Sequence, residues 1–569
     1  MRICIACLIC LLAAVPGFAE ETVLAEIDEL EPGQLELRAF ELDQEQEVEI
    51  DAVGLQAHRN FDELTAAWIL DAESRGVVWE MGEARPTRRR KELREYADTV
   101  HLRAGIYEVY YATYPGRDHH AGQWWEEAAR TVVEALLGWD DYEDLTADLQ
   151  LTVRGAGRAW SSQETDRFHQ ELREEALISL AGLHDELAEH QGFVLEREME
   201  LEIYALGELT RDGGYDYGWI LDTKTREQVW SFDYRDSDRA GGAVKNRVVR
   251  TELSLPAGSY AAFFVTDGSH SPEQWNVLPP HDPVFWGLTL WARHPSQKQW
   301  AQRAEYRHLP EDRVIAELTG LGDDEYLSQG MTLEQPMDVR IYAIGEGGRR
   351  GMSDYGWLAD ARSRETVWEM SYDRTTHAGG SQKNRLVDEI LHLEPGSYLL
   401  SFVTDGSHAY RDWNADPPSY PQRWGITLFS AEEHFDPSAV SEYRAEEDPA
   451  ILARIGRMRD DRRERQEFSL DRDAEVLIYA LGEGTDGRMY DYGWIEDSRS
   501  GRTVWEMDYR STERAGGAEK NRLYRGKIPL SAGEYTLYYE TDDSHSFEDW
   551  NAAPPHDPEG WGIQVLVVD

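Results

Sequence analysis

The chain contains little cysteine and little lysine. Cys4, Cys7 and Cys10 are the only Cys among 569 residues, so residues 20–569 contain none. A Cys-free segment can form no disulfide, no thiolate nucleophile and no Cys-ligated zinc site. Lys is scarce as well, since the 58 basic residues comprise seven Lys and 51 Arg.

Positive charge is also in short supply. The 58 basic residues face 109 acidic ones, which gives a formal net charge of −51 at pH 7. Such a chain repels nucleic acid and anionic membrane surfaces, so nucleic acid is excluded as a predicted partner. With 41% hydrophobic and 11% aromatic residues, the chain can still build real hydrophobic cores and is not expected to be disordered.

Long apolar runs are absent after the first residues. Arg2, an apolar run over residues 3–15 and the small residues Gly17 and Ala19 predict a secretory signal peptide cut after Ala19. No later segment reaches the roughly 20 apolar residues of a membrane span, so no transmembrane segment is predicted. We therefore expect an exported protein, periplasmic or extracellular and bacterial, because it must be stable without disulfides. The sequence does not fix its oligomeric state.

Internal repetition dominates what is present. The sequence Asp-Tyr-Gly-Trp at 216–219 returns at 354–357 and 491–494, with offsets of 138 and 137 residues. Thr266 to His270 returns at 404–408 and 541–545 with the same offsets. A weaker copy over 68–107 keeps the aromatic skeleton and lacks most polar motifs. Short alternating segments such as 476–480, 503–507 and 535–539, with Gly-containing turns between them, predict antiparallel strands.

These observations predict a mainly β protein of four tandem antiparallel β-sandwich repeats, jelly-roll or Ig-like, joined by short helix-containing linkers. Apolar residues three and four apart over 165–189, 311–321 and 449–462 indicate the helices. The predicted boundaries are 1–19 for the signal peptide, 20–156 for the degenerate first repeat, 157–192 for a linker, 193–293 for repeat 2, 294–328 for a linker, 329–430 for repeat 3, 431–465 for a linker and 466–569 for repeat 4. The degenerate first repeat is interpreted as a terminal cap or dimer contact, and its His119-His120 and Trp124-Trp125 hint at a separate role.

A Gly-Gly-x-x-Lys-Asn-Arg motif recurs in repeats 2 to 4, and it takes three of the seven Lys. Its candidate ligand-binding residues are Lys245, Asn246, Arg247, Lys383, Asn384, Arg385, Lys520, Asn521 and Arg522. Because the chain uses Arg at almost all other basic positions, the Lys of this motif implies that the site requires the compact ammonium group and not a guanidinium. The glycine pair could expose backbone amides to an anion or a ligand oxygen. The alternative is an internal ion pair of Lys245 or Arg247 with Asp216 or Asp267.

A second polar cluster follows a strand and leads into a Pro-stiffened loop of constant length. Its candidate ligand-binding residues are Asp267, His270, Trp275, Asn276, Asp405, His408, Trp413, Asn414, Asp542, His545, Trp550 and Asn551. Exposed Trp beside Asn, Asp and His suits a sugar-binding surface, through stacking and a few directed hydrogen bonds. The alternative is that the loop folds back and Trp275 plugs the end of the sandwich.

Other chemistries are less well supported by these motifs. Zinc on Asp267 and His270 would need further ligands, and no cofactor is predicted. Calcium remains possible, since Asp and backbone oxygens suit it, although no EF-hand loop is present. Serine catalysis at Ser269 lacks the strand-to-helix elbow that exposes such a nucleophile.

The function predicted from the sequence is an exported, non-enzymatic, multivalent binding protein for glycan or another surface polymer. Three similar modules with triplicated polar motifs support it, and no block remains for a catalytic domain. The first alternative is a structural or assembly protein of the bacterial envelope, in which the motifs only stabilise the fold. The second is a hydrolase with its site between Asp267, His270 and Lys245.

Overall fold

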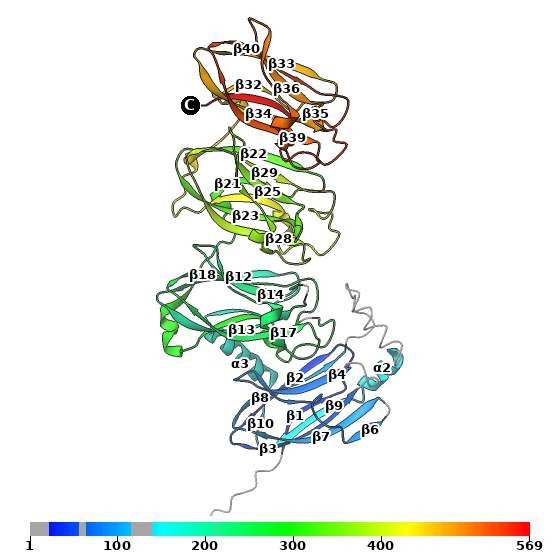
Figure 1. The fold of residues 1–569 in the computed structure, drawn as a ribbon. Coiled ribbons are helices and arrows are strands. Elements are labelled where there is room, and N and C mark those ends of the chain that lie inside the picture. The colour runs from blue at the N-terminus through cyan, green and yellow to red at the C-terminus, as the bar shows by residue number, and fades with distance from the viewer. Residues whose placement is uncertain are drawn as a thin grey trace, which may run out of the picture. The chain divides into compact units, whose positions relative to one another are not determined.

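The structure, a computed structural model, describes residues 22–55, 64–90, 92–114, 139–211, 213–272 and 274–568. Across these ranges the chain is mainly β, and its antiparallel strands form eight sheets that pair into four β-sandwiches (Figure 1). The predicted fold class is thereby confirmed. The signal peptide predicted at 1–19 and the residues 119–120 and 124–125 lie outside the described ranges.

Contacts divide the chain into two compact units. The first comprises residues 1–308 and holds the first and second sandwiches, and segments 379–382 and 417–419 group with it. The second comprises the rest of 309–569 and holds the third and fourth sandwiches.

The first unit contains four five-stranded sheets. In the first sandwich, one sheet is β1 (Thr22–Asp28), β9 (Gln150–Gly155), β3 (Gln46–Leu55), β7 (Leu93–Leu102) and β6 (Arg88–Arg90), in that order. Its partner sheet is β10 (Arg158–Ala159), β2 (Leu35–Leu42), β8 (Gly105–Thr113), β4 (Thr65–Asp71) and β5 (Gly76–Glu80). In the second sandwich, one sheet is β11 (Ile178–Ala181), β19 (Gly287–Ala292), β13 (Met199–Glu208), β17 (Asn246–Leu255) and β16 (Asp238–Arg239). Its partner is β15 (Gln228–Ser231), β14 (Tyr217–Asp222), β18 (Gly258–Val265), β12 (Ala188–Leu195) and β20 (Ala301–Ala304).

The second unit repeats this arrangement. In the third sandwich, one sheet is β21 (Val314–Thr319), β30 (Gly425–Ser430), β23 (Met337–Gly348), β28 (Asn384–Leu393) and β27 (Thr376–His377), with β24 (Gly351–Met352) on β23. Its partner is β26 (Thr366–Glu369), β25 (Tyr355–Asp360), β29 (Gly396–Val403), β22 (Tyr326–Leu333) and β31 (Val440–Glu442). In the fourth sandwich, one sheet is β32 (Ile451–Ile455), β41 (Gly562–Val567), β34 (Ala474–Thr485), β39 (Asn521–Leu530) and β38 (Glu513–Arg514), with β35 (Arg488–Met489) on β34. Its partner is β33 (Arg463–Leu470), β40 (Gly533–Glu540), β36 (Tyr492–Asp497) and β37 (Arg502–Glu506).

Helices are few in the described ranges. The two α-helices there are α2 (Trp139–Thr146) and α3 (Ser162–Glu175). The 3₁₀ turns are η1 (Tyr234–Asp236), η2 (Pro283–Phe285), η3 (Pro295–Trp300), η4 (Glu311–Arg313), η5 (Tyr372–Arg374), η6 (Pro421–Arg423), η7 (Pro437–Ala439), η8 (Ala445–Glu447), η9 (Tyr509–Ser511) and η10 (Pro558–Gly560). None of the helices in the described part of the chain is long and apolar enough to cross a bilayer.

One predicted helix forms in part and two do not form. Of the segment predicted over 165–189, α3 covers residues up to Glu175, and β11 takes residues 178–181. Helix α3 begins at a capping box in which Ser161 and Glu164 satisfy each other's backbone amides. The α-helices predicted over 311–321 and 449–462 are replaced by β21 and β32, which pair with β30 and β41, respectively. Alternate burial explains the difference, because Ala316 and Leu318 both face the core and only a strand places residues two apart on one face. The sheets thus include residues from the segments predicted as linkers.

Each sandwich encloses its own hydrophobic core between the two sheets. Among the recurring aromatic residues of the second sandwich, Tyr260 and Trp286 are 2% and 0% exposed, and Trp219 is buried on the outer face of its sheet. Trp230 is only partly buried and packs against the core edge. A buried Trp, at 286, 424 or 561, immediately precedes β19, β30 or β41 in the second, third and fourth sandwiches.

Candidate functional site

The recurring polar motifs meet at one end of each of the last three sandwiches. In the third sandwich, Asn384 begins β28 and pairs in register with Glu346 of β23. Asp354 immediately precedes β25, and Asp405 follows β29 in the loop that carries His408. Because β25 and β29 are hydrogen-bonded neighbours, the two loops are brought together. The second and fourth sandwiches repeat this arrangement.

The Asn of the Lys-Asn-Arg motif is a buried staple. In the fourth sandwich Asn521 is fully buried, and its Nδ2 donates to the carbonyls of Gly516 and Ala553 at 2.9 and 3.0 Å. His545 Nε2 donates to its Oδ1 at 2.5 Å. The pairs His270–Asn246 and His408–Asn384 repeat this contact at 2.5 and 2.6 Å. The Asn therefore ties the glycine loop to the Pro-Pro loop.

The glycine pair is required by close packing. Gly241 and Gly242 have φ of +85° and +57°, a left-handed backbone conformation that favours glycine. A Cβ on Gly242 would lie 2.0 Å from the carbonyl oxygen of Pro279. The pair thus lets the two loops touch, which accounts for it without an anion.

The Trp of the Pro-rich loop packs inward. Trp275 is 6% exposed, and its ring meets those of His270 and Trp286 edge-on at 4.8 and 5.1 Å. Trp413 and Trp550, which are partly buried, make the same contacts in their sandwiches. Trp275 therefore plugs the end of its sandwich and offers no open face for sugar stacking.

The Arg of the motif holds a neighbouring turn. Arg385 donates from Nε to Thr375 Oγ1 at 2.8 Å, and its guanidinium lies 4.7 Å from the Tyr372 ring. Arg247 and Arg522 make the equivalent contacts. The sequence suggested an ion pair of Arg247 with Asp216 or Asp267. Arg247, Arg385 and Arg522 instead donate to Ser237, Thr375 and Thr512.

The Lys of the motif pairs with a glutamate that the sequence reading did not single out. Lys245, Lys383 and Lys520 lie 2.8, 3.2 and 3.0 Å from carboxylate oxygens of Glu208, Glu346 and Glu483, respectively. The predicted partners Asp216 and Asp267 are thus replaced by Glu208. Lys383 and Lys520 also donate to Asn414 and Asn551. A Gly-Glu pair eight residues before each Asp-Tyr-Gly-Trp segment was the sequence signal available for this glutamate.

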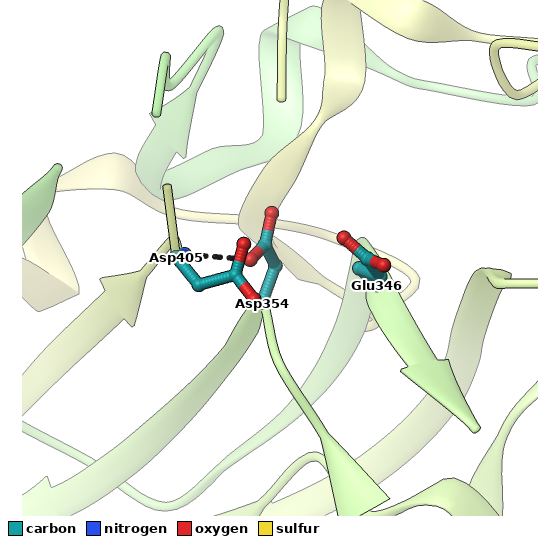
Figure 2. A group of neighbouring side chains, drawn as sticks. All are labelled: Glu346, Asp354 and Asp405. Atoms are coloured by element: carbon teal, nitrogen blue, oxygen red, sulfur yellow. Dashed lines mark hydrogen bonds between the residues drawn. The ribbon is translucent and has the colours of Figure 1, made fainter. Parts of the chain in front are cut away.

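Three carboxylates gather beside this Lys in the third and fourth sandwiches. They are Glu346, Asp354 and Asp405 in the third and Glu483, Asp491 and Asp542 in the fourth, and in each group one carboxylate oxygen per residue lies within 4.8 Å of the others. Figure 2 shows the first group, with Asp354 between the other two and the backbone amide of Asp405 bonded to Asp354. We name these two groups the carboxylate triads. Among the described residues, the equivalent Glu208, Asp216 and Asp267 do not form such a group.

Hydrogen bonds hold the triads in place. Asp354 accepts from the Asp405 amide at 2.8 Å and from Trp424 Nε1 at 3.0 Å, while Asp405 accepts from the Ser407 amide. Glu483 is 7% exposed, and its buried Oε2 accepts no hydrogen bond. Each oxygen of an ionised carboxylate has two lone pairs, so the triads keep capacity to bind a cation.

Burial perturbs the titration of these groups. It raises the pKa of Asp354 and of Asp491 to about 8, and the nearby carboxylates Asp405 and Asp542 add to the effect. It lowers the pKa of His408 and of His545 to about 4, aided by Lys383 and Lys520. At neutral pH the two histidines are therefore neutral, and the two aspartates retain protons unless a cation compensates their charge.

A pH dependence of stability follows. A carboxyl whose folded pKa is about 8 keeps a proton that the unfolded chain has lost, so stability falls as pH rises from 6.5 to 8. Between pH 4 and 6.5 the histidines act in the opposite direction, because their folded pKa is depressed and acid must protonate them. In EDTA, melting of the full chain should show the decline above pH 6.5, with a slope of up to about 1.4 kcal/mol per pH unit for each carboxyl. Saturating Ca²⁺ should remove it, and a flat profile in EDTA would contradict these assignments.

Comparisons with known proteins give no family. No family model matches the chain, and no curated protein matches it. Among solved structures it is similar to the CUB1-EGF-CUB2 domain of human MASP-1/3, with 10% identity over 44% of this chain and 96% of that one and a TM-score of 0.14. It is also similar to the CUB1-EGF-CUB2 domains of rat MASP-1, with 9% identity over 44% and 93% of the two chains and a TM-score of 0.13. Likeness at this level carries no argument about function.

Proposed function

We propose that the protein is an exported, non-enzymatic, multivalent binding protein whose third and fourth sandwiches each bind a calcium ion at the carboxylate triad and use it to engage a glycan or another surface polymer. The observation that carries the proposal is the pair of triads. The export and the bacterial envelope location follow from the signal-like residues 1–19 and the Cys-free remainder.

The charge of each triad suits a divalent cation. Three carboxylates beside one Lys ammonium leave two negative charges when all groups are ionised. Ca²⁺ takes six to eight oxygen ligands in flexible geometry, which carboxylates at loop positions can supply in part. The buried Oε2 of Glu483, which accepts no hydrogen bond, supports such a ligand role.

The exposure of the triads suits a role in binding. Asp405 is exposed and Asp542 is half-buried, so an ion held there would face solvent on one side. Because the triads supply fewer oxygens than calcium needs, hydroxyl or carboxylate oxygens of a ligand could complete its shell. Two such modules in one chain would gain avidity on a polymer.

Calcium titration tests the proposal. The full chain should take up two Ca²⁺ per molecule in isothermal titration calorimetry. Asp405→Asn combined with Asp542→Asn should weaken this uptake by about tenfold or more, because each triad loses a charged ligand. Asn can still accept the bonds that Ser407 and Ser544 donate, which protects the fold.

Asp267→Asn is the matched control, because it makes the same change in the second sandwich, where no triad forms. It should leave the uptake unchanged. No calcium uptake by the parent chain, or equal uptake by the double variant, would contradict the proposal. Cosedimentation with insoluble cellulose, chitin and peptidoglycan, in Ca²⁺ and in EDTA, then tests the polymer.

A second candidate function is a structural or assembly protein of the envelope. It is favoured by the burial of the motif Asn and His in all three sandwiches, since Asn246, Asn384 and Asn521 are all 0% exposed. If the protein took up calcium but did not cosediment with any of the polymers, this second function would be favoured.

A further inference from the structure

The junction between the third and fourth sandwiches, inside the second unit, contains two adjoining hollows. One has a volume of about 210 Å³ and the other about 510 Å³. Both are lined by Tyr326, Tyr355, Trp357 and His556. The rings of these four residues contact one another at centroid distances of 5.6 to 6.0 Å, so they form one aromatic wall. We name the two hollows together the junction groove.

The equivalent junction in the first unit is filled. There Trp68 corresponds to Trp357, and it stacks on its cross-strand partner Tyr110 at 5.1 Å. Leu278, from the Pro-rich loop of the second sandwich, packs into the same apolar cluster. Trp68 and Tyr110 are 0% and 1% exposed as a result.

Two small side chains distinguish the junction groove from its filled counterpart. Trp357 has Ser401 as its cross-strand partner, at the position that Tyr110 takes beside Trp68. Ala553 stands where the second sandwich has Leu278. A Tyr and a Leu are thus replaced by a Ser and an Ala at the two positions that fill the first junction.

One ion pair is common to both junctions. Arg364 of the third sandwich reaches Asp557 of the fourth at 3.0 Å, and Tyr479 donates to the same carboxylate at 3.0 Å. In the first unit Arg75 and Tyr204 make the same contacts to Asp282. The same ion pair braces both junctions, and Ser401 and Ala553 leave space in the second. The first junction also contains Glu108, which binds Arg75, where the third sandwich has Leu399.

The lining chemistry indicates the kind of occupant. The aromatic wall offers ring faces, and Thr366, Arg364 and Glu369 supply donors and acceptors beside it. Asp324, Glu325 and Asp405 line the larger hollow, whose described lining contains no Lys or Arg. Arg514 and Arg525 in the smaller hollow are balanced by Glu513 and Asp557. Aromatic faces with a few directed polar groups suit a sugar, and the carboxylates of the larger hollow would repel an acidic one.

We propose that the junction groove binds a short segment of an uncharged oligosaccharide. This inference rests on the proposed function and names the site and ligand class of the polymer binding. Asp405 belongs both to the triad of the third sandwich and to the groove, so a calcium ion there would lie at the groove's edge.

The test fills the groove with the side chains of the other junction. Ser401→Tyr combined with Ala553→Leu, in the full chain, should reduce binding of cellohexaose, maltohexaose or chitohexaose at least tenfold by calorimetry. Melting temperature and calcium uptake should stay unchanged, because the first unit accommodates the same side chains. Ser401→Ala is the matched control, since it keeps the space and should keep the binding. Should the filled variant misfold, His556→Ala removes an exposed part of the wall and should weaken binding.

Opposite results are equally clear. Unchanged hexasaccharide binding by the filled variant, or by His556→Ala, would overturn the groove as the site while leaving calcium binding at the triads intact. Tighter binding of hexagalacturonate than of the neutral sugars would overturn the ligand class. Binding of a Lys-rich peptide with no binding of any hexasaccharide would assign the groove to cationic protein segments instead. If the parent chain took up no calcium, that result would contradict the proposed function itself and not only the groove.

Discussion

Replacing Arg75 with Met should destabilise the first unit by about 3–5 kcal/mol, the usual cost of removing one partner of a buried ion pair. The Arg75 side chain is 3% exposed and bridges Glu108 and Asp282 at 2.7 and 2.6 Å, and these carboxylates are 1% and 2% exposed. Burial alone would raise the pKa of Glu108, but Arg75 and His169 lower it to about 2, so the charge is held by its partners. Equilibrium urea unfolding of the full chain, with hydrogen exchange followed in β8 and β19, measures the loss.

The matched control neutralises all three groups. Arg75→Met with Glu108→Gln and Asp282→Asn leaves no uncompensated charge and should recover most of the stability. Arg154→Met removes a salt bridge whose Arg and Asp side chains are 39% and 53% exposed, and should change unfolding far less. If Arg75→Met cost no more than Arg154→Met, the ion pair would not hold the two sandwiches together.

Asn521→Ala should destabilise the fourth sandwich by roughly 3 kcal/mol. The change removes three buried hydrogen bonds and leaves His545 Nε2 and the Gly516 carbonyl unmet, whereas the Ala553 carbonyl still accepts from the Ala518 amide. Each unmet group costs about 1–3 kcal/mol, with partial relaxation. Urea unfolding, with hydrogen exchange followed in β39 and β41, reports the effect.

Asn551→Ala provides the contrast at the same site. Asn551 is exposed and accepts from Lys520, with a further contact to His545, so its loss should affect unfolding less than the loss of the buried Asn521. Equal effects of the two variants would mean that the buried Asn is not the staple between the two loops.

The sequence allowed the strands to be predicted because their patterns are local. Alternation at Val476, Ile478 and Ala480 places every second side chain of β34 in the core. In the same sandwich, Gly501 marks the turn that joins β36 and β37. The segment Val314–Thr319 could not be assigned by such a local pattern. Five of its six residues are apolar or β-branched, and this composition fits a helix and a strand alike. Pairing with β30, which lies more than 100 residues later in sequence, decided its conformation.

The sequence allowed the location of the candidate site to be predicted, but not which side chains contact one another within it. Repetition singled out Lys383 and Asn384 in one motif and His408 in another, and the structure brings the two motifs together. It could not show that Lys383 would choose Glu346, because register across β23 and β28 sets that pairing. The ring of Trp413 packs against Trp424. This depends on how a long loop folds back, which no local sequence pattern encodes.

The junction arginines occupy an unusual backbone position. Arg75 and Arg364 have φ of +54° and +56° in the hairpin turn of their sandwiches, and Gly501, with φ of +66°, occupies the same position in the fourth. Glycine is the residue that such a turn favours, so each Arg stands there at some conformational cost and repays it through a carboxylate of the following sandwich. A protein engineer who wished to append a fifth sandwich through this joint would therefore have to install Gly501→Arg and present it with an Asp. In the second sandwich Arg226 holds the same position, with φ of +65°, and donates to Tyr306 instead, so an Arg in this turn forms such a joint only together with an Asp in the following sandwich.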